Sequence, residues 1–118
     1  MGVLSKLLGT RKAAREVRPQ HEVIVHFLYG STNLQHLYAL EDLLRIAVSD
    51  ASAGEYDGCE MADDGSDGNL YMYGPDAEAL YRAISPVLAA CPFIHGATVT
   101  LQFGPPKRKT PKRVIQIP

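Results

Sequence analysis

The feature that most constrains this chain is a strand, a helix and a second strand in succession between residues 69 and 106. In residues 70–73, Leu and Met alternate with Tyr, which is the two-residue period of a strand with two different faces. Asp76 then stands at a helix N-cap position, because its carboxylate can accept a hydrogen bond from the N–H groups of the first turn. Apolar residues follow at helical spacing: Leu80, Ile84, Val87, Leu88 and Cys91. A second alternating run, residues 97–103, predicts the closing strand.

Pro86 interrupts the helical pattern, because it lacks the N–H that would bond to the carbonyl of Arg82. Two outcomes fit this position. Either the helix kinks, or Ser85 caps a second short helix that has Pro86 as its first residue.

The first half of the chain follows the same order of elements. Residues 23–29 are apolar on both faces apart from His26, as in a central strand. Thr32 and Gln35 have the spacing of a capping box and predict a helix from about residue 33 to residue 49. Residues 55–61 predict a second strand, and a loop rich in Asp and Gly returns the chain to the strand at Leu70 as a hairpin.

Two β-α-β units joined by a hairpin predict an α+β protein. The order β-α-β-β-α-β is the ferredoxin-like split arrangement, an antiparallel sheet with both helices on one face. A weak internal repeat supports it, since Tyr29-Gly30 stands before the first helix as Tyr73-Gly74 stands before the second. Residues 112–117 are expected to add a short extra strand.

Charge divides the chain into three parts. Residues 1–20 carry five Lys and Arg against Glu16, a net of +4, and are expected to form a basic, flexible leader. Residues 21–106 carry twelve Asp and Glu against two Arg, a net of −10, and form the predicted α+β domain. Residues 107–118 are a basic C-terminal tail with a net charge of +5. The acidic domain should repel phosphate backbones and attract basic surfaces.

Cys59 and Cys91 lie in apolar patterns without CxxC spacing, and no cleavable signal peptide is recognised. A reducing, cytoplasmic setting is therefore expected. One face of a short helix in the leader would carry Val3, Leu4, Leu7 and Leu8. This pattern leaves open a contact of residues 1–18 with a membrane surface.

The candidate binding surface is the face of the sheet opposite the helices. If Val23, Val25 and Phe27 point to the helices, alternation places a second set on the other face. That set is His26, Tyr71, Tyr73, Thr98, Thr100 and Gln102. Such a face favours a second copy of the chain or another protein as its partner. Stacking of RNA bases on the two tyrosines is an alternative, although the negative charge of the domain argues against nucleic acid.

No constellation of residues indicates catalysis. The four histidines share no ligand spacing on any one element, and the acidic loop after residue 62 departs from a calcium loop at Gly65 and Gly74. We therefore expect no metal and no cofactor. The preferred function is a non-enzymatic protein-interaction module that forms a homodimer. The alternatives are an acidic inhibitor or immunity-type protein that neutralises a basic partner, and a small enzyme or ligand-binding domain on the same sheet face.

Five short motifs suggest a family. They are GEYDG at 54–58, YGPDA at 73–77, PVL at 86–88, ATVTL at 97–101 and FGPP at 103–106. With them, the chain resembles a family of small, uncharacterised bacterial α/β proteins over roughly residues 22–106. The resemblance implies a bacterial cytosolic protein. It transfers no activity, because the motifs consist mostly of turn glycines, prolines and core positions.

Overall fold

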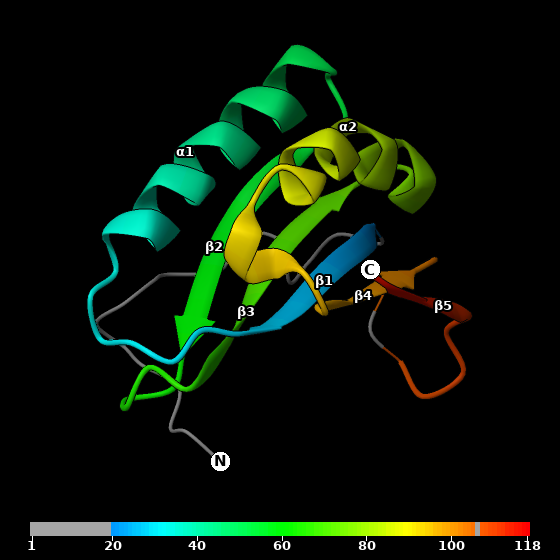
Figure 1. Ribbon diagram of the computed structural model, residues 1–118. Helices are drawn as coiled ribbons and strands as arrows, with labels where there is room; N and C mark the ends of the chain where they lie inside the picture. Colours follow the sequence, from blue (N-terminus) through cyan, green and yellow to red (C-terminus); the bar gives the residue numbers. More distant parts are fainter. Residues whose placement is uncertain (1–19, 106) are drawn as a thin grey trace.

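The computed structural model describes residues 20–105 and 107–118 (Figure 1). Its elements are β1 (His21–Leu28), α1 (Gln35–Asp50), β2 (Glu55–Met61), β3 (Asp67–Gly74), α2 (Ala77–Ala89), the 3-10 turn η2 (Pro92–Ile94), β4 (Thr98–Gln102) and β5 (Lys112–Gln116). The predicted leader (residues 1–20, apart from Gln20) and its predicted membrane contact (residues 1–18) lie outside the described part. Within that part, no helix is long and apolar enough to cross a membrane.

The strands form one sheet in the order β2-β3-β1-β4-β5, and every neighbouring pair is antiparallel. β3 lies between β1 and β2, and β1 lies between β3 and β4, so each β-α-β unit is split by a strand of the other. Both helices lie on one side of the sheet (Figure 1). The α+β class is confirmed, and so is the extra strand, which pairs with β4 at the edge of the sheet.

The core lies between the helices and the face of the sheet below them. Every second residue of the three inner strands is buried there: Val23, Val25, Phe27, Leu70, Met72, Val99 and Leu101. Each helix contributes a stripe of buried apolar side chains to the core. On α1 these are Leu37, Leu40, Leu44 and Val48, and on α2 they are Leu80, Ile84 and Leu88. The alternation read from the sequence therefore assigns the correct residues to the core face.

α1 begins later than the capping-box prediction requires, and that prediction is wrong. Gln35 is the first helical residue, and Leu34 occupies the N-cap without a side-chain cap. The side chain of Asn33 instead binds the first residue of the helix: its Oδ1 accepts a hydrogen bond from the N–H of Gln35 at 3.1 Å. Ser31 Oγ in turn accepts from the N–H of Asn33 at 2.9 Å. These local turn bonds compete with the geometry that a Thr32 cap would need.

α2 begins at its predicted cap. Asp76 Oδ1 accepts from the N–H of Glu78 at 2.9 Å. His21 Nδ1 accepts from the N–H of Ala77 at 3.0 Å, which joins the first turn of the helix to the start of β1. The helix then continues through Pro86 to Ala89, so Ser85 does not begin a second helix.

Two glycines allow the open end of the β2–β3 hairpin to close. A Cβ atom on Gly54 would lie 2.1 Å from the carbonyl oxygen of Tyr73, and one on Gly74 would lie 2.1 Å from the carbonyl oxygen of Ala53. No side chain fits at either position. The pair therefore fixes the start of β2 against the end of β3.

The buried stripe of α2 gives a direct test of the core. Leu80 and Ile84 are fully buried, so Leu80→Ala or Ile84→Ala should lower the free energy of unfolding by about 2–5 kcal/mol. Arg82→Ala, on the exposed side of the same helix, should change it by less than about 0.5 kcal/mol. Urea denaturation followed by circular dichroism measures all three. Equal effects at the three positions would contradict this assignment of the core face.

Candidate functional site

The six residues predicted as a binding surface all lie on the sheet face opposite the helices. The pairing places them in rows across β3, β1 and β4. His26 lies opposite Thr98, Ile24 lies between Tyr71 and Thr100, and Glu22 lies between Tyr73 and Gln102. Glu55 and Glu60 of β2 extend two of these rows. We call the following set the open face: Glu22, Ile24, His26, Glu55, Glu60, Tyr71, Tyr73, Thr98, Thr100 and Gln102.

The two tyrosines of the open face are not an exposed platform. Tyr71 keeps only 8% of its accessible surface and Tyr73 only 3%. Their hydroxyl groups donate to carboxylates of β2, Tyr71 Oη to Glu60 Oε1 at 2.5 Å and Tyr73 Oη to Glu55 Oε1 at 2.6 Å. Base stacking requires accessible rings, and both of these rings are covered.

Two further contacts join polar groups of the open face to neighbouring residues. His26 Nε2 lies 3.0 Å from Asp67 Oδ2, and both side chains are partly exposed. Thr98 Oγ1 donates to Gln116 Oε1 at 3.3 Å. Across residues 20–105 and 107–118, no group of three or more His, Cys, Asp or Glu is arranged to hold a metal ion.

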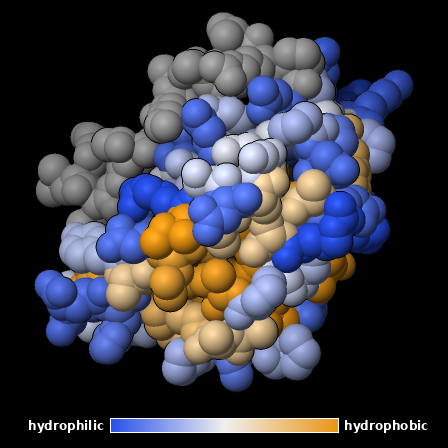
Figure 2. Space-filling view, turned by 90° about the horizontal axis from the view of Figure 1, so that it is seen from above, coloured by the Kyte–Doolittle hydropathy of each residue, from blue (hydrophilic) through white to orange (hydrophobic). Residues whose placement is uncertain are grey.

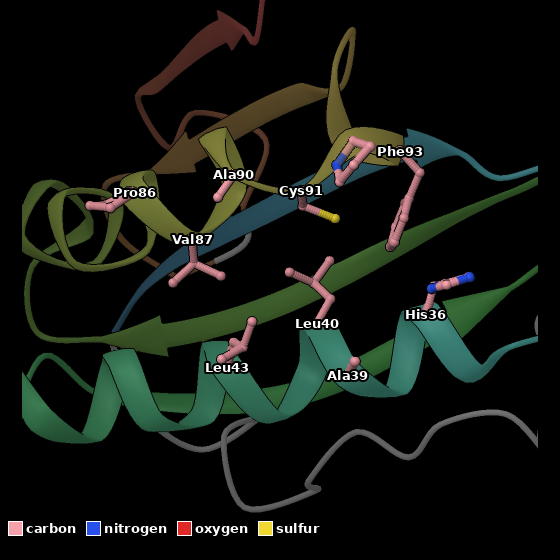
Figure 3. Close-up of a pocket in the computed structure, with 10 residues that line it drawn as sticks. His36, Ala39, Leu40, Leu43, Pro86, Val87, Ala90, Cys91 and Phe93 are labelled. Carbon is pink, nitrogen blue, oxygen red and sulfur yellow. The ribbon is translucent and has the colours of Figure 1, made fainter.

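A groove of about 760 Å³ lies on the other side of the molecule, between α1 and α2. α1 contributes Leu40 and Leu43, α2 contributes Val87 and Ala90, and Cys91 and Phe93 follow from the segment after α2. Figure 3 shows Leu40 and Leu43 directed toward Val87, Cys91 and Phe93 across the gap. Figure 2 shows a continuous apolar patch on the side of the molecule where the two helices lie. We call this site the α1–α2 groove.

The α1–α2 groove contains few polar groups. Among its lining side chains only His36 and Cys91 carry a polar or titratable atom, and Asp, Glu, Lys and Arg are absent from the lining. Its volume lies within the range of small-molecule sites, but such sites need several convergent polar groups to orient a ligand. The groove therefore resembles an apolar contact surface more than an active site.

A buried pair of side chains holds the α1 wall of the groove in place. Tyr56 Oη of β2 donates to Glu41 Oε2 of α1 at 2.7 Å, and both residues are buried. Burial first, and then the neighbouring Glu41 carboxylate, raises the pKa of Tyr56 above its usual value, so the phenol remains a donor. The Arg45 guanidinium lies 5.2 Å from the centre of the Tyr56 ring. Together these contacts attach α1 to β2 and orient Leu40 and Leu43 toward α2.

Neither cysteine has the environment of a nucleophile. Burial, followed by the influence of Glu41, raises the pKa of Cys59 to about 12. Partial burial also raises the pKa of Cys91. A reactive cysteine requires a lowered pKa, because the thiolate is the attacking species. Both residues therefore act as small apolar side chains, and Cys91 does so in the wall of the groove.

The α1–α2 groove was not predicted from the sequence, although a signal for it exists. The stripe of α1 that faces the core includes Leu37, Leu40 and Leu44. Ala39, Leu43 and Ile46 form a second stripe with helical spacing outside that core face. Leu43 is 55% exposed and Ile46 is 56% exposed. A helix with two apolar stripes indicates a second contact surface.

The fold and the groove together define a small α+β protein that presents an uncharged apolar surface on its helical layer. Comparison of the chain with protein-family models, with curated proteins and with solved structures gives no match. The groove and the open face are therefore the features from which a function is inferred.

The two thiols should differ in reactivity. At about pH 8, an aromatic disulfide reagent should modify Cys91 in the folded protein and leave Cys59 intact, because Cys59 is completely buried. Since both pKa values are raised, the reaction at Cys91 should be slower than that of a model thiol and should accelerate as the pH rises. Absorbance of the released thiolate measures the rate, and Cys91→Ala is the control. Rapid modification of Cys59 in the folded protein would contradict the assigned burial.

Proposed function

We propose that this protein is a non-enzymatic protein-interaction module that forms a homodimer through the α1–α2 groove. The observation that carries the proposal is the apolar, uncharged lining of the groove. The exposed stripe of Ala39, Leu43 and Ile46 on α1 borders the groove. Exposed apolar patches of this kind mark interaction surfaces in soluble proteins.

Charge favours the groove as the place where two copies meet. Residues 21–106 have a net charge of −10, so the acidic surfaces of two copies repel each other. The groove lining has no acidic side chain and therefore avoids this repulsion. It replaces the open face as the expected dimer interface, because Tyr71 and Tyr73 of that face are already buried in one chain.

The arrangement of the helical layer also supports the proposal of a two-fold interface. A symmetric dimer uses the same patch on both copies, so the patch must be complementary to itself. Here the exposed stripe on α1 lies beside the groove that α1 forms with α2. In a two-fold arrangement, Leu43 and Ile46 of one copy can enter the groove of the other while the reverse contact forms at the same time.

An enzymatic role for the groove is disfavoured by its chemistry. General acid–base catalysis needs a titratable group positioned against a substrate, and nucleophilic catalysis needs an activated nucleophile. His36 lies at one end of the groove (Figure 3), and Cys91 has a raised pKa. We also propose a cytoplasmic location in a bacterium, which suits the two thiols and the resemblance described above.

A second candidate function is inhibition of a basic partner, which the carboxylates of the open face favour. Glu55 and Glu60 lie on that face, away from the groove, and both keep part of their surface exposed. Binding of a basic protein there would weaken steeply as salt is added, whereas dimerisation through an apolar groove would not.

Replacement of Leu43 by Asp tests the groove interface. Sedimentation equilibrium should give a dimer for the wild type and a folded monomer for Leu43→Asp, because each new carboxylate would face its own copy across the two-fold axis. We expect the dimer dissociation constant to rise at least about tenfold, which corresponds to about 1.4 kcal/mol. Circular dichroism confirms that the variant is folded.

Val114→Asp is the matched control, since Val114 is similarly exposed, at 59%, but lies on β5 in the row of Thr100. It should leave the dimer intact. In the wild type, modification of Cys91 should also slow as the protein concentration rises, because the second copy covers the groove. A monomeric wild type, or a dimer broken only by Val114→Asp, would overturn the proposal.

A further inference from the structure

Strand β5 (Lys112–Gln116) forms one edge of the sheet and pairs with β4 along one side only (Figure 1). Successive residues of an antiparallel strand direct their N–H and C=O groups alternately to its two sides. Just outside the paired residues, the N–H of Ile117 donates to the carbonyl of Ala97 at 2.9 Å, and the carbonyl of Pro111 accepts from the N–H of Phe103 at 3.0 Å. The odd-numbered residues of this segment therefore direct their backbone groups toward β4.

The even-numbered residues of β5 have the opposite orientation. The N–H and C=O groups of Lys112, Val114 and Gln116 face outward along the edge. Within residues 20–105 and 107–118, no strand lies on that side of β5. None of the turn and loop hydrogen bonds of those residues reaches these three backbones either. An edge of this kind can bind one more extended segment through its main chain.

The side chains around this edge are basic. Residues 107–109, in the loop that leads into β5, are two Lys and one Arg, and all three are exposed. Lys112 and Arg113 begin the strand itself. Arg113 Nη1 donates to Glu78 Oε2 of α2 at 3.0 Å, whereas the other four cations form no ion pair with a described residue. Residues 107–118 contain no Asp or Glu and have a net charge of +5, so the edge attracts acidic ligands.

We propose that β5 binds an extended acidic segment of another protein as a sixth strand of the sheet. The outward backbone groups of β5 hold the main chain of that segment, and the cations beside them select its carboxylates. A second copy fits this edge less well, because pairing of β5 with itself brings two segments of net charge +5 together. The inference goes beyond the proposed dimer and does not depend on it, since no residue of β5 lines the α1–α2 groove.

The side chains of β5 also indicate the sequence of the acidic segment. Lys112 and Val114 lie in the rows of Gln102 and Thr100, so both are on the same side of the sheet. Val114 is 59% exposed. A segment paired with β5 therefore places an acidic residue opposite Lys112 and, two positions along, an apolar residue opposite Val114. Further acidic residues continue toward the loop at 107–109.

Amide hydrogen exchange of the full chain, followed by NMR, tests this docking residue by residue. The probe is the synthetic peptide acetyl-Thr-Thr-Val-Thr-Glu-Glu-Glu-amide. In the free protein, the N–H groups of Arg113 and Ile115 should exchange more slowly than those of Lys112, Val114 and Gln116, because only the former bond to β4. Peptide at concentrations up to about 1 mM should slow exchange at the latter three by at least about tenfold.

A control peptide has the same sequence with every amide nitrogen methylated. It keeps the three carboxylates but has no N–H groups for a ladder, so it should give no protection.

Val114→Pro tests the edge from the side of the protein. Proline removes the central outward N–H, which the fold does not use, so the variant should remain folded. Isothermal titration calorimetry should show at least about a tenfold loss of affinity for the peptide. Val114→Thr keeps the N–H and is the matched control, which should retain binding.

Unchanged exchange at Lys112, Val114 and Gln116 in the presence of about 1 mM peptide would overturn the proposal, even if Val114→Pro fails to fold. Equal affinity for the methylated peptide would overturn it too, because charge alone would then explain binding. Protection that rises with protein concentration alone would assign the edge to a second copy. Tighter binding of a single-stranded oligonucleotide than of the peptide would assign it to nucleic acid, and either result would contradict the proposed partner.

Discussion

The structure depends on the pairing of β1 with β3 on one side and with β4 on the other. β1 is the central strand of five. It belongs to the first β-α-β unit and lies between β3 and β4, the two strands of the second unit. Its register decides which residues face the helices, since a slip of one residue would exchange the two faces. Val23 and Val25 are thereby committed to the core, and Glu22 and His26 to the open face.

The two faces of the protein have opposite chemistry. The helical layer presents the apolar α1–α2 groove, and the sheet presents carboxylates whose partners are tyrosine hydroxyls. Apolar contact responds weakly to salt, whereas ion pairing responds strongly. The proposed dimer should therefore depend only weakly on salt, because its interface lies on the apolar helical layer.

Much of the fold could be predicted because the signals are local. Alternation in residues 70–73 and the cap at Asp76 depend only on neighbours in the chain, and both agree with the structure. The capping box at Thr32 failed because Ser31 and Asn33 form turn bonds that are equally local. Two local patterns competed there, and the sequence did not rank them. The α1–α2 groove was missed because Leu43 and Cys91 are 48 positions apart in the printed sequence and meet only when the helices pack.

The sequence by itself determined the order of elements, the residues of the core face and the uneven distribution of charge, because these follow from periodicity and composition. It also assigned Tyr71, Tyr73 and Gln102 to the face opposite the helices, since alternation along a strand is fixed by the backbone. Only the tertiary structure decided that the tyrosines are buried against Glu55 and Glu60. Burial and hydrogen bonding depend on which strand lies alongside, and that pairing is a property of the whole sheet.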